Sequence, residues 1–237
     1  MVTQGKVQLI KTLPYKKNLY TQGIERISDN ELIISGGRYG ESTIVTYNLL
    51  ENKFETKIIF SSDFFAEGLT LVKDETFWLL SFKEETAIQF SLTDLSKLKE
   101  VSYEGQGWGI AYDKQKHCLW MTNGGHILQK RDPDNFELIK EISIEVDHVP
   151  ISRINELEYV DGFLYSNIWQ TNKIIKISPE QGTVLKVYDL SEIMEELHLN
   201  KRFYPDIDFL NGIAHLQQSR FLLTGKLFPL MMEVTLD

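Results

Sequence analysis

A single carboxylate, Glu67, stands immediately before an apolar stretch in the segment AEGLTLV. Burying an ionised carboxylate is costly, so a charge at the start of such a strand needs a reason. Asn155 also precedes an apolar stretch, and Lys226 follows one. A carboxyl group can transfer protons, while amide and ammonium groups can stabilise developing negative charge. These residue types are suited to acid–base catalysis if the fold brings them together.

The elements that would position these residues form an internal repeat. Five segments share a polar or aromatic residue, usually a glycine, a short apolar strand, a polar turn and a second apolar strand; they begin at Thr21, Ala66, Gly107, Ile154 and Leu210. Positions 23, 68, 109, 156 and 212 are equivalent and are separated by 45, 41, 47 and 56 residues. A second pair of strands, with turns such as DPDN and PEQG, follows each of the first four segments. Four strands in about 45 residues are typical of a propeller blade.

We therefore predict an all-β protein, a five-bladed β-propeller with four-stranded blades, as a single domain over residues 1–237. The first strand, KVQLIKTLPY, has no inner segment of its own and is predicted to complete the last blade. The longest step contains the insertion DLSEIMEELHLNKRFYPDID. With Ser191 as a plausible N-cap and acidic residues in the first turn, a short helix is predicted near 191–199.

Propeller geometry brings equivalent positions together, because the first strand of each blade lines the central channel. The residues before the glycine position are Gln22, Glu67, Trp108, Asn155 and Asn211. The second strands end near Gly37, Phe82, Asn123, Trp169 and Lys226. Aromatic walls with a few polar groups are typical of a small-molecule site. The alternative is a polar channel that holds only water.

Charge and composition exclude some classes of function. The chain has 237 residues and a net charge of −9 without a basic tract, so no nucleic-acid partner is expected. No apolar run approaches the length of about 20 residues that spans a bilayer. The start of the chain has no signal-peptide region, so the protein is cytosolic or an export signal has been removed. The single cysteine, Cys118, excludes an intramolecular disulfide and is expected to be buried and inert.

Seven segments occur in an order that closely resembles the glutamine cyclotransferase family, the plant-type and bacterial glutaminyl-peptide cyclotransferases. They are YTQGIE, FAEGLTL, GWGIAYD, RINELEYVDG, NIWQTNKIIKIS, DIDFLNGIA and TGKLFP. The resemblance covers nearly the full chain. It implies a five-bladed propeller and an aminoacyltransferase that converts the N-terminal glutamine of peptides or proteins to pyroglutamate and releases ammonia.

The resemblance also implies roles for individual residues. Glu67 matches the acid/base of the family, and Asn155 and Lys226 are further catalytic candidates. The substrate-binding candidates are Tyr20, Gln22, Phe82, Trp108 and Trp169. Phe82 and Phe228 stand where the family usually has tryptophan, which keeps an aromatic wall but removes an indole N–H.

No cofactor is expected to be required, and no metal ligand is assigned, although the resemblance allows a structural calcium ion in the channel. The five histidines show no ligand-like pairing, which disfavours a zinc mechanism. We expect a monomer, and members of the family are commonly exported. Two alternatives stay open: a non-catalytic propeller that binds peptide N-termini, and a metal-dependent propeller hydrolase or lactonase.

Overall fold

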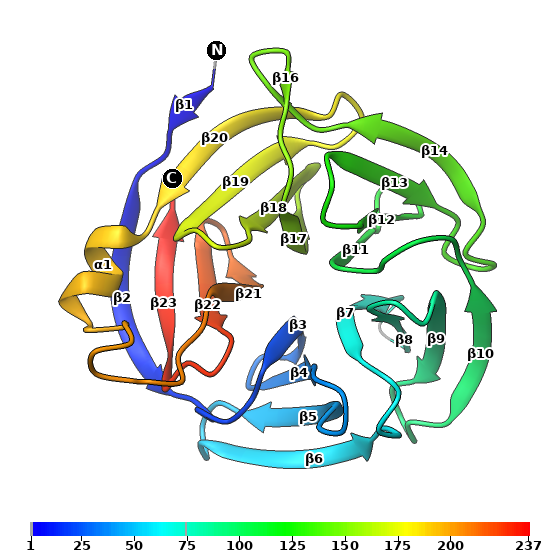
Figure 1. The fold of residues 1–237 in the computed structure, drawn as a ribbon, viewed down its shortest axis with the longest axis horizontal. Coiled ribbons are helices and arrows are strands. Elements are labelled where there is room, and N and C mark those ends of the chain that lie inside the picture. The colour runs from blue at the N-terminus through cyan, green and yellow to red at the C-terminus, as the bar shows by residue number, and fades with distance from the viewer. Residues whose placement is uncertain (1, 74) are drawn as a thin grey trace.

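The computed structural model describes residues 2–73 and 75–237. Within these residues the strands form five sheets around a common axis, and each sheet runs from an inner strand to an outer one (Figure 1). Inner strands such as β3 (Thr21–Ser28) and β7 (Ala66–Val72) are buried at their starts, whereas outer strands such as β6 (Lys53–Ile59) and β10 (Lys97–Ser102) are mostly exposed. This burial explains why the inner strands are short apolar runs and the outer ones are polar.

The first sheet contains β3 (Thr21–Ser28), β4 (Glu31–Gly36), β5 (Thr43–Asn48) and β6 (Lys53–Ile59). The second contains β7 (Ala66–Val72), β8 (Thr76–Ser81), β9 (Thr86–Ser91) and β10 (Lys97–Ser102). The third contains β11 (Ile110–Asp113), β12 (Cys118–Thr122), β13 (Ile127–Arg131) and β14 (Leu138–Ser143). The fourth is built on β17 (Ile154–Val160), β18 (Phe163–Ile168), β19 (Lys173–Ser178) and β20 (Thr183–Asp189). The fifth contains β21 (Leu210–Gln217), β22 (Arg220–Gly225), β23 (Leu230–Leu236) and β2 (Val7–Pro14).

The prediction of five four-stranded blades is wrong. Over the described ranges, four sheets are four-stranded blades, and the remaining sheet, the fourth along the chain, has seven strands. Its outer strand β20 pairs in parallel with both β1 (Thr3–Gln4) and β15 (Glu145–Val146), and β15 forms a hairpin with β16 (Val149–Pro150). An outer strand leaves N–H and C=O groups unpaired, and segments passing beside that edge bond to it. Strands of two residues are too short to show alternation in the sequence.

The N-terminal strand closes the last blade, as predicted. β2 lies antiparallel to β23, with a register that runs from Val7 opposite Leu236 to Pro14 opposite Leu230. The ring is therefore closed by hydrogen bonds between the two ends of the chain, which Figure 1 shows as adjacent blue and red strands. Closure by pairing removes two sheet edges that would otherwise be open.

The predicted insertion contains the helix α1 (Ser191–Glu196). The role predicted for Ser191 is wrong, because Leu190 occupies the N-cap position and Ser191 is the first helical residue. The carboxylate of Asp189 instead accepts a hydrogen bond from the Ser191 N–H at 2.9 Å. No helix among the described residues has both the length and the apolar character needed to cross a membrane.

The hydrophobic core lies in layers between neighbouring sheets. Trp120 of β12, for example, packs in one layer with Leu164 of β18, and both side chains are fully buried. Cys118 lies in the same layer, where burial raises the pKa of its thiol to about 11, as expected of an unreactive thiol. Packing on both faces fixes each sheet, and therefore fixes where each inner strand begins.

The inner strands touch backbone to backbone near the axis, and the repeated glycines make this possible. A Cβ atom on Gly68 would lie 2.6 Å from the Trp108 carbonyl oxygen, and one on Gly109 would lie 2.2 Å from that of Asn155. Glu156 stands at the equivalent position of the fourth sheet. Its buried carboxylate accepts hydrogen bonds from the main-chain N–H groups of Ile24 and Ile213, which belong to two other sheets. This layer separates the start of the inner strands from their far ends.

Candidate active site

A cavity of about 230 Å³ lies where the inner strands begin, next to the close backbone contacts at Gly68 and Gly109. It is lined by Tyr20, Gln22, Phe65, Glu67, Phe82, Trp108, Asn155, Trp169 and Lys226. All eight residues predicted from the sequence therefore meet in one cavity, and they come from all five repeats. Their catalytic and substrate-binding roles stay predictions.

Phe65 lines the cavity but is missing from the predicted set. Tyr20, immediately before β3, and Gln22, within it, are two residues apart, and both face the cavity. Because side chains alternate along a strand, the residue two positions before Glu67 must face the same way. Applying the Tyr20–Gln22 relation to the second repeat would have identified Phe65.

Other residues considered from the sequence lie outside the cavity. Phe228 is fully buried in the core and packs against Gly225, so the prediction that it forms part of the wall is wrong. Asn123 uses its Oδ1 to accept the N–H of Gly125 at 3.0 Å, and Asn211 is buried behind Gln22. The guanidinium of Arg38 lies over the ring of Tyr20, 4.8 Å from its centroid.

Aromatic rings form one continuous wall of the cavity. The ring centroids of Phe65 and Phe82 are 5.3 Å apart, and those of Phe82 and Trp108 are 6.4 Å apart. Trp108 and Trp169 meet edge to face at 5.5 Å. Such contacts keep the wall rigid and exclude water from one side of the cavity. The wall is therefore suited to methylene groups of a substrate.

Glu67 is the buried carboxyl group of the cavity, with 5% of its surface exposed. Burial raises its pKa to about 8, while the nearby ammonium of Lys226 opposes the shift and Glu84 adds to it. The Nε2 of Gln22 donates a hydrogen bond to Glu67 Oε1 at 3.2 Å. Burial therefore outweighs the ammonium group, and Glu67 is mainly a neutral carboxylic acid at pH 7.

Lys226 is nearly as buried as Glu67, with 6% exposure. Burial lowers the pKa of its ammonium group, and the acidic side chains of Glu67 and Asp208, when ionised, act in the opposite direction. Its Nζ lies 5.0 Å from the centroid of the Tyr20 ring, and the Tyr20 hydroxyl donates to Asp208 Oδ2 at 2.8 Å. A cation is thus held beside the acid without a bulk-water shell.

Two buried polar atoms of the cavity residues have no bonding partner among the described residues: Asn155 Oδ1 and Trp169 Nε1. Trp108 differs, because its Nε1 already donates to Gln106 Oε1 at 3.0 Å. Buried polar atoms without partners are rare in folded proteins and mark places where a ligand supplies the missing bond. Asn155 Oδ1 can therefore accept a hydrogen bond from a polar substrate, and Trp169 Nε1 can donate one to it.

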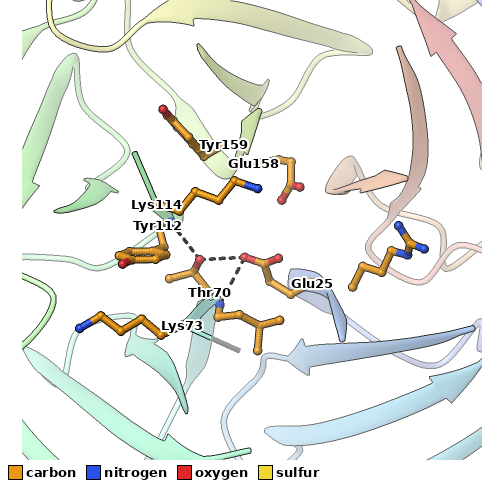
Figure 2. A pocket seen from close by; sticks show the side chains of 9 residues that line it. Glu25, Thr70, Lys73, Tyr112, Lys114, Glu158 and Tyr159 are labelled. Carbon is orange, nitrogen blue, oxygen red and sulfur yellow. Dashed lines mark hydrogen bonds between the residues drawn. The ribbon is translucent and has the colours of Figure 1, made fainter. Parts of the chain in front are cut away.

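A second cavity, of about 210 Å³, lies at the far ends of the inner strands (Figure 2). Glu25 and Glu158 both line it, and Lys114 extends toward Glu158. Glu25 already accepts a hydrogen bond from the Thr70 hydroxyl at 2.7 Å, and Glu158 accepts one from the His215 N–H at 3.1 Å. These carboxylates therefore anchor the main chain and side chains of neighbouring strands.

Known proteins resemble this chain over its whole length. Residues 1–236 match the family model described as glutamine cyclotransferase. A glutaminyl-peptide cyclotransferase from Arabidopsis thaliana is 30% identical, over 98% of this chain and 72% of the relative. The crystal structure of a glutaminyl cyclase from Myxococcus xanthus is 28% identical and matches with a TM-score of 0.84, over 100% of this chain and 99% of that chain. A PQQ-bound aldose sugar dehydrogenase from Streptomyces coelicolor, at 11% identity and a TM-score of 0.62 over 99% of both chains, shares the fold alone. This chain belongs to the glutamine cyclotransferase family.

Proposed function

We propose that this protein is a glutaminyl-peptide cyclotransferase that converts the N-terminal glutamine of peptides or proteins to pyroglutamate. The observation that carries the proposal is the cavity in which a buried carboxyl group with a pKa of about 8, a buried ammonium group and unpaired polar atoms face one another. Its volume of about 230 Å³ is below the range of about 300–1,000 Å³ typical of drug-sized ligands. That size suits one residue at the end of a chain.

The first step is attack of the neutral α-amine on the carbonyl carbon of the glutamine side-chain amide. A C–N bond forms, and the carbonyl π electrons move to the oxygen. The aromatic wall holds the side chain folded, and orientation of this kind supplies much of the rate of an intramolecular reaction. The Nε1–H of Trp169 and the ammonium of Lys226 stabilise the oxyanion, because buried donors are effective where charge develops.

The second step is departure of ammonia. The neutral carboxyl of Glu67 gives its proton to the leaving amide nitrogen, and the C–NH₂ bond breaks as the carbonyl re-forms. The resulting carboxylate then takes the extra proton from the attacking nitrogen, so Glu67 ends in its starting state. Asn155 Oδ1 accepts a hydrogen bond from the α-amine and directs its lone pair. A group with a pKa near the working pH is suited to both transfers.

The reaction as proposed requires no metal ion. The proposed calcium ion in the channel would be structural, and no step involves it. Among the described residues, no group of three His, Cys, Asp or Glu side chains is arranged to hold a metal ion. The described residues therefore do not form the carboxylate cage of a metal-dependent hydrolase or lactonase.

The test is ammonia release from a short peptide that begins with glutamine, with and without chelator. Glu67→Gln removes the acid, and Glu51→Gln, on an exposed turn, is the matched control. We expect release that resists chelator, persists in the control and is lost in Glu67→Gln. Release no faster than the spontaneous reaction across several glutamine peptides would leave a propeller that binds peptide N-termini without reacting. Release that survives Glu67→Gln would refute the proposed mechanism.

A further inference from the structure

Asn211 lies at the start of β21 and is fully buried outside the cavity. Its Nδ2 donates to the main-chain oxygens of Thr21 at 3.0 Å and Gln22 at 3.2 Å. Carbonyl oxygens accept hydrogen bonds and never donate them, so the nitrogen of this amide must face them. The orientation of the Asn211 side chain is therefore set by the backbone of the neighbouring sheet.

The orientation of Asn211 determines that of Gln22. The same Nδ2 lies 3.3 Å from Gln22 Oε1, which can only accept. With its oxygen held by Asn211, the Gln22 amide turns its Nε2 toward Glu67 Oε1, at 3.2 Å. The opposite orientation would place Gln22 Oε1 against Glu67 Oε1, which are two acceptors whenever Glu67 is ionised.

We propose that Asn211 is a positioning residue that acts through Gln22 to keep a hydrogen-bond donor on Glu67. This inference rests on the proposed function of Glu67 and concerns how that residue is held ready. Asn211 precedes the glycine position of the last repeat and lies behind the cavity. The four residues at the equivalent positions of the other repeats line the cavity. The bonds of Asn211 also cross the junction between the last and first sheets.

The donor has a chemical consequence. An N–H directed at a carboxyl oxygen stabilises the ionised form, which Glu67 must adopt after it protonates the leaving group. It also restrains the plane of the carboxyl group. Without Asn211 both orientations of the Gln22 amide become accessible, and the donor is lost for part of the time.

A double-mutant cycle with a pH profile tests this link. Asn211→Ala cannot donate to Gln22 Oε1 in any protonation state, Asn211→Asp cannot donate once it is ionised, and Gln22→Met removes the amide. Each single variant should move the pKa of Glu67 upward by about 0.5 to 1 unit in the pH profile of kcat/KM for a glutamine peptide. The double variant should move it no further than one single variant, and kcat should fall more than KM changes.

Asn167→Asp is the matched control for a new buried carboxyl group. Asn167 is also buried, and its Oδ1 accepts the N–H of Gly212 at 3.1 Å, a bond that an aspartate can keep. Any shift that Asn167→Asp causes in the pH profile of kcat/KM should add to the shift caused by Gln22→Met. If Asn211→Asp does not fold, Asn211→Ala takes its place in the cycle and adds no charge.

Two results would overturn the inference: a pH profile unchanged by either Asn211 variant, or shifts of Asn211 and Gln22 variants that add. Both are distinct from failure of the proposed function, which would appear as no ammonia release by the unmodified protein. A purely structural role for Asn211 would lower stability without moving the profile.

Discussion

The burial of Glu67 should make the free energy of unfolding fall as the pH rises between the pKa of this group in the unfolded chain and its pKa in the folded protein. The fold raises the pKa of this carboxyl group from 4.5 to about 8, so the folded state binds its proton more tightly than the unfolded chain does. The resulting stability is present in full below the unfolded value and is lost as pH rises toward the folded value. Glu67→Gln keeps the shape of the side chain and removes the titration.

The magnitude follows from the two pKa values. Linkage between 4.5 and about 8 makes the folded state less stable by about 3 kcal/mol at pH 7.5 relative to pH 5. Glu67→Gln should therefore gain about 3 kcal/mol relative to the unmodified protein over this interval, while losing activity. Gln22 can still donate to the oxygen of the new amide, which limits other losses.

Urea unfolding of both proteins at pH 5 and pH 7.5 measures this difference. Taking the difference between the two proteins at each pH cancels the titration of other buried carboxyl groups that act independently of Glu67. Glu51→Gln is the control for loss of one exposed carboxylate. A stability difference between Glu67→Gln and the unmodified protein that is the same at both pH values would refute the reasoning. It would mean that Glu67 is ionised at little cost and that Lys226 outweighs burial.

Three further predictions concern other parts of the site. Lys226→Met removes the cation that lowers the pKa of Glu67, so the pH profile of kcat/KM should move to higher pH and kcat should fall about 100-fold; movement to lower pH would contradict this. Gly109→Ala places a Cβ 2.2 Å from the Asn155 oxygen and should cost about 1–3 kcal/mol in urea unfolding, together with activity. Burial and Glu158 raise the pKa of Glu156 well above 4.5, so Glu156→Gln should gain stability over the unmodified protein as pH rises from 5 to 8, and a constant difference would exclude this cause.

Much of the site was predictable because the repeats are visible in the sequence, and the propeller geometry brings equivalent positions of the repeats together. Once the residue before each repeated glycine is aligned, a ring of inner strands must place Glu67 and Asn155 at one mouth of the channel. Closure by the first strand was predictable for a related reason, since KVQLIKTLPY is a strand without a blade. These inferences needed only periodicity and topology.

The remaining features depend on contacts that the sequence does not encode locally. Phe228 and Phe82 look alike in the sequence, yet one lies in the core and the other lines the cavity. The balance between burial and Lys226 at Glu67 depends on solvent exclusion, which only the packed structure determines. The extra strands beside β20 are pairs of residues whose pairing is set by where the chain passes.

The cavity is assembled at the junction where the ring closes, so its chemistry depends on that closure. Tyr20 and Lys226, far apart in the chain, form an antiparallel bridge, and the N–H of Leu227 donates to the Leu19 oxygen at 2.9 Å. Asn211 bonds across the same junction to Gln22. An opened ring would separate Lys226 and Asn211 of the last sheet from Gln22 and Glu67, whose own sheets could stay folded. Activity should therefore be lost before the inner sheets unfold when pairing between β2 and β23 is weakened, because the site needs both ends of the chain and Glu67 alone is not sufficient.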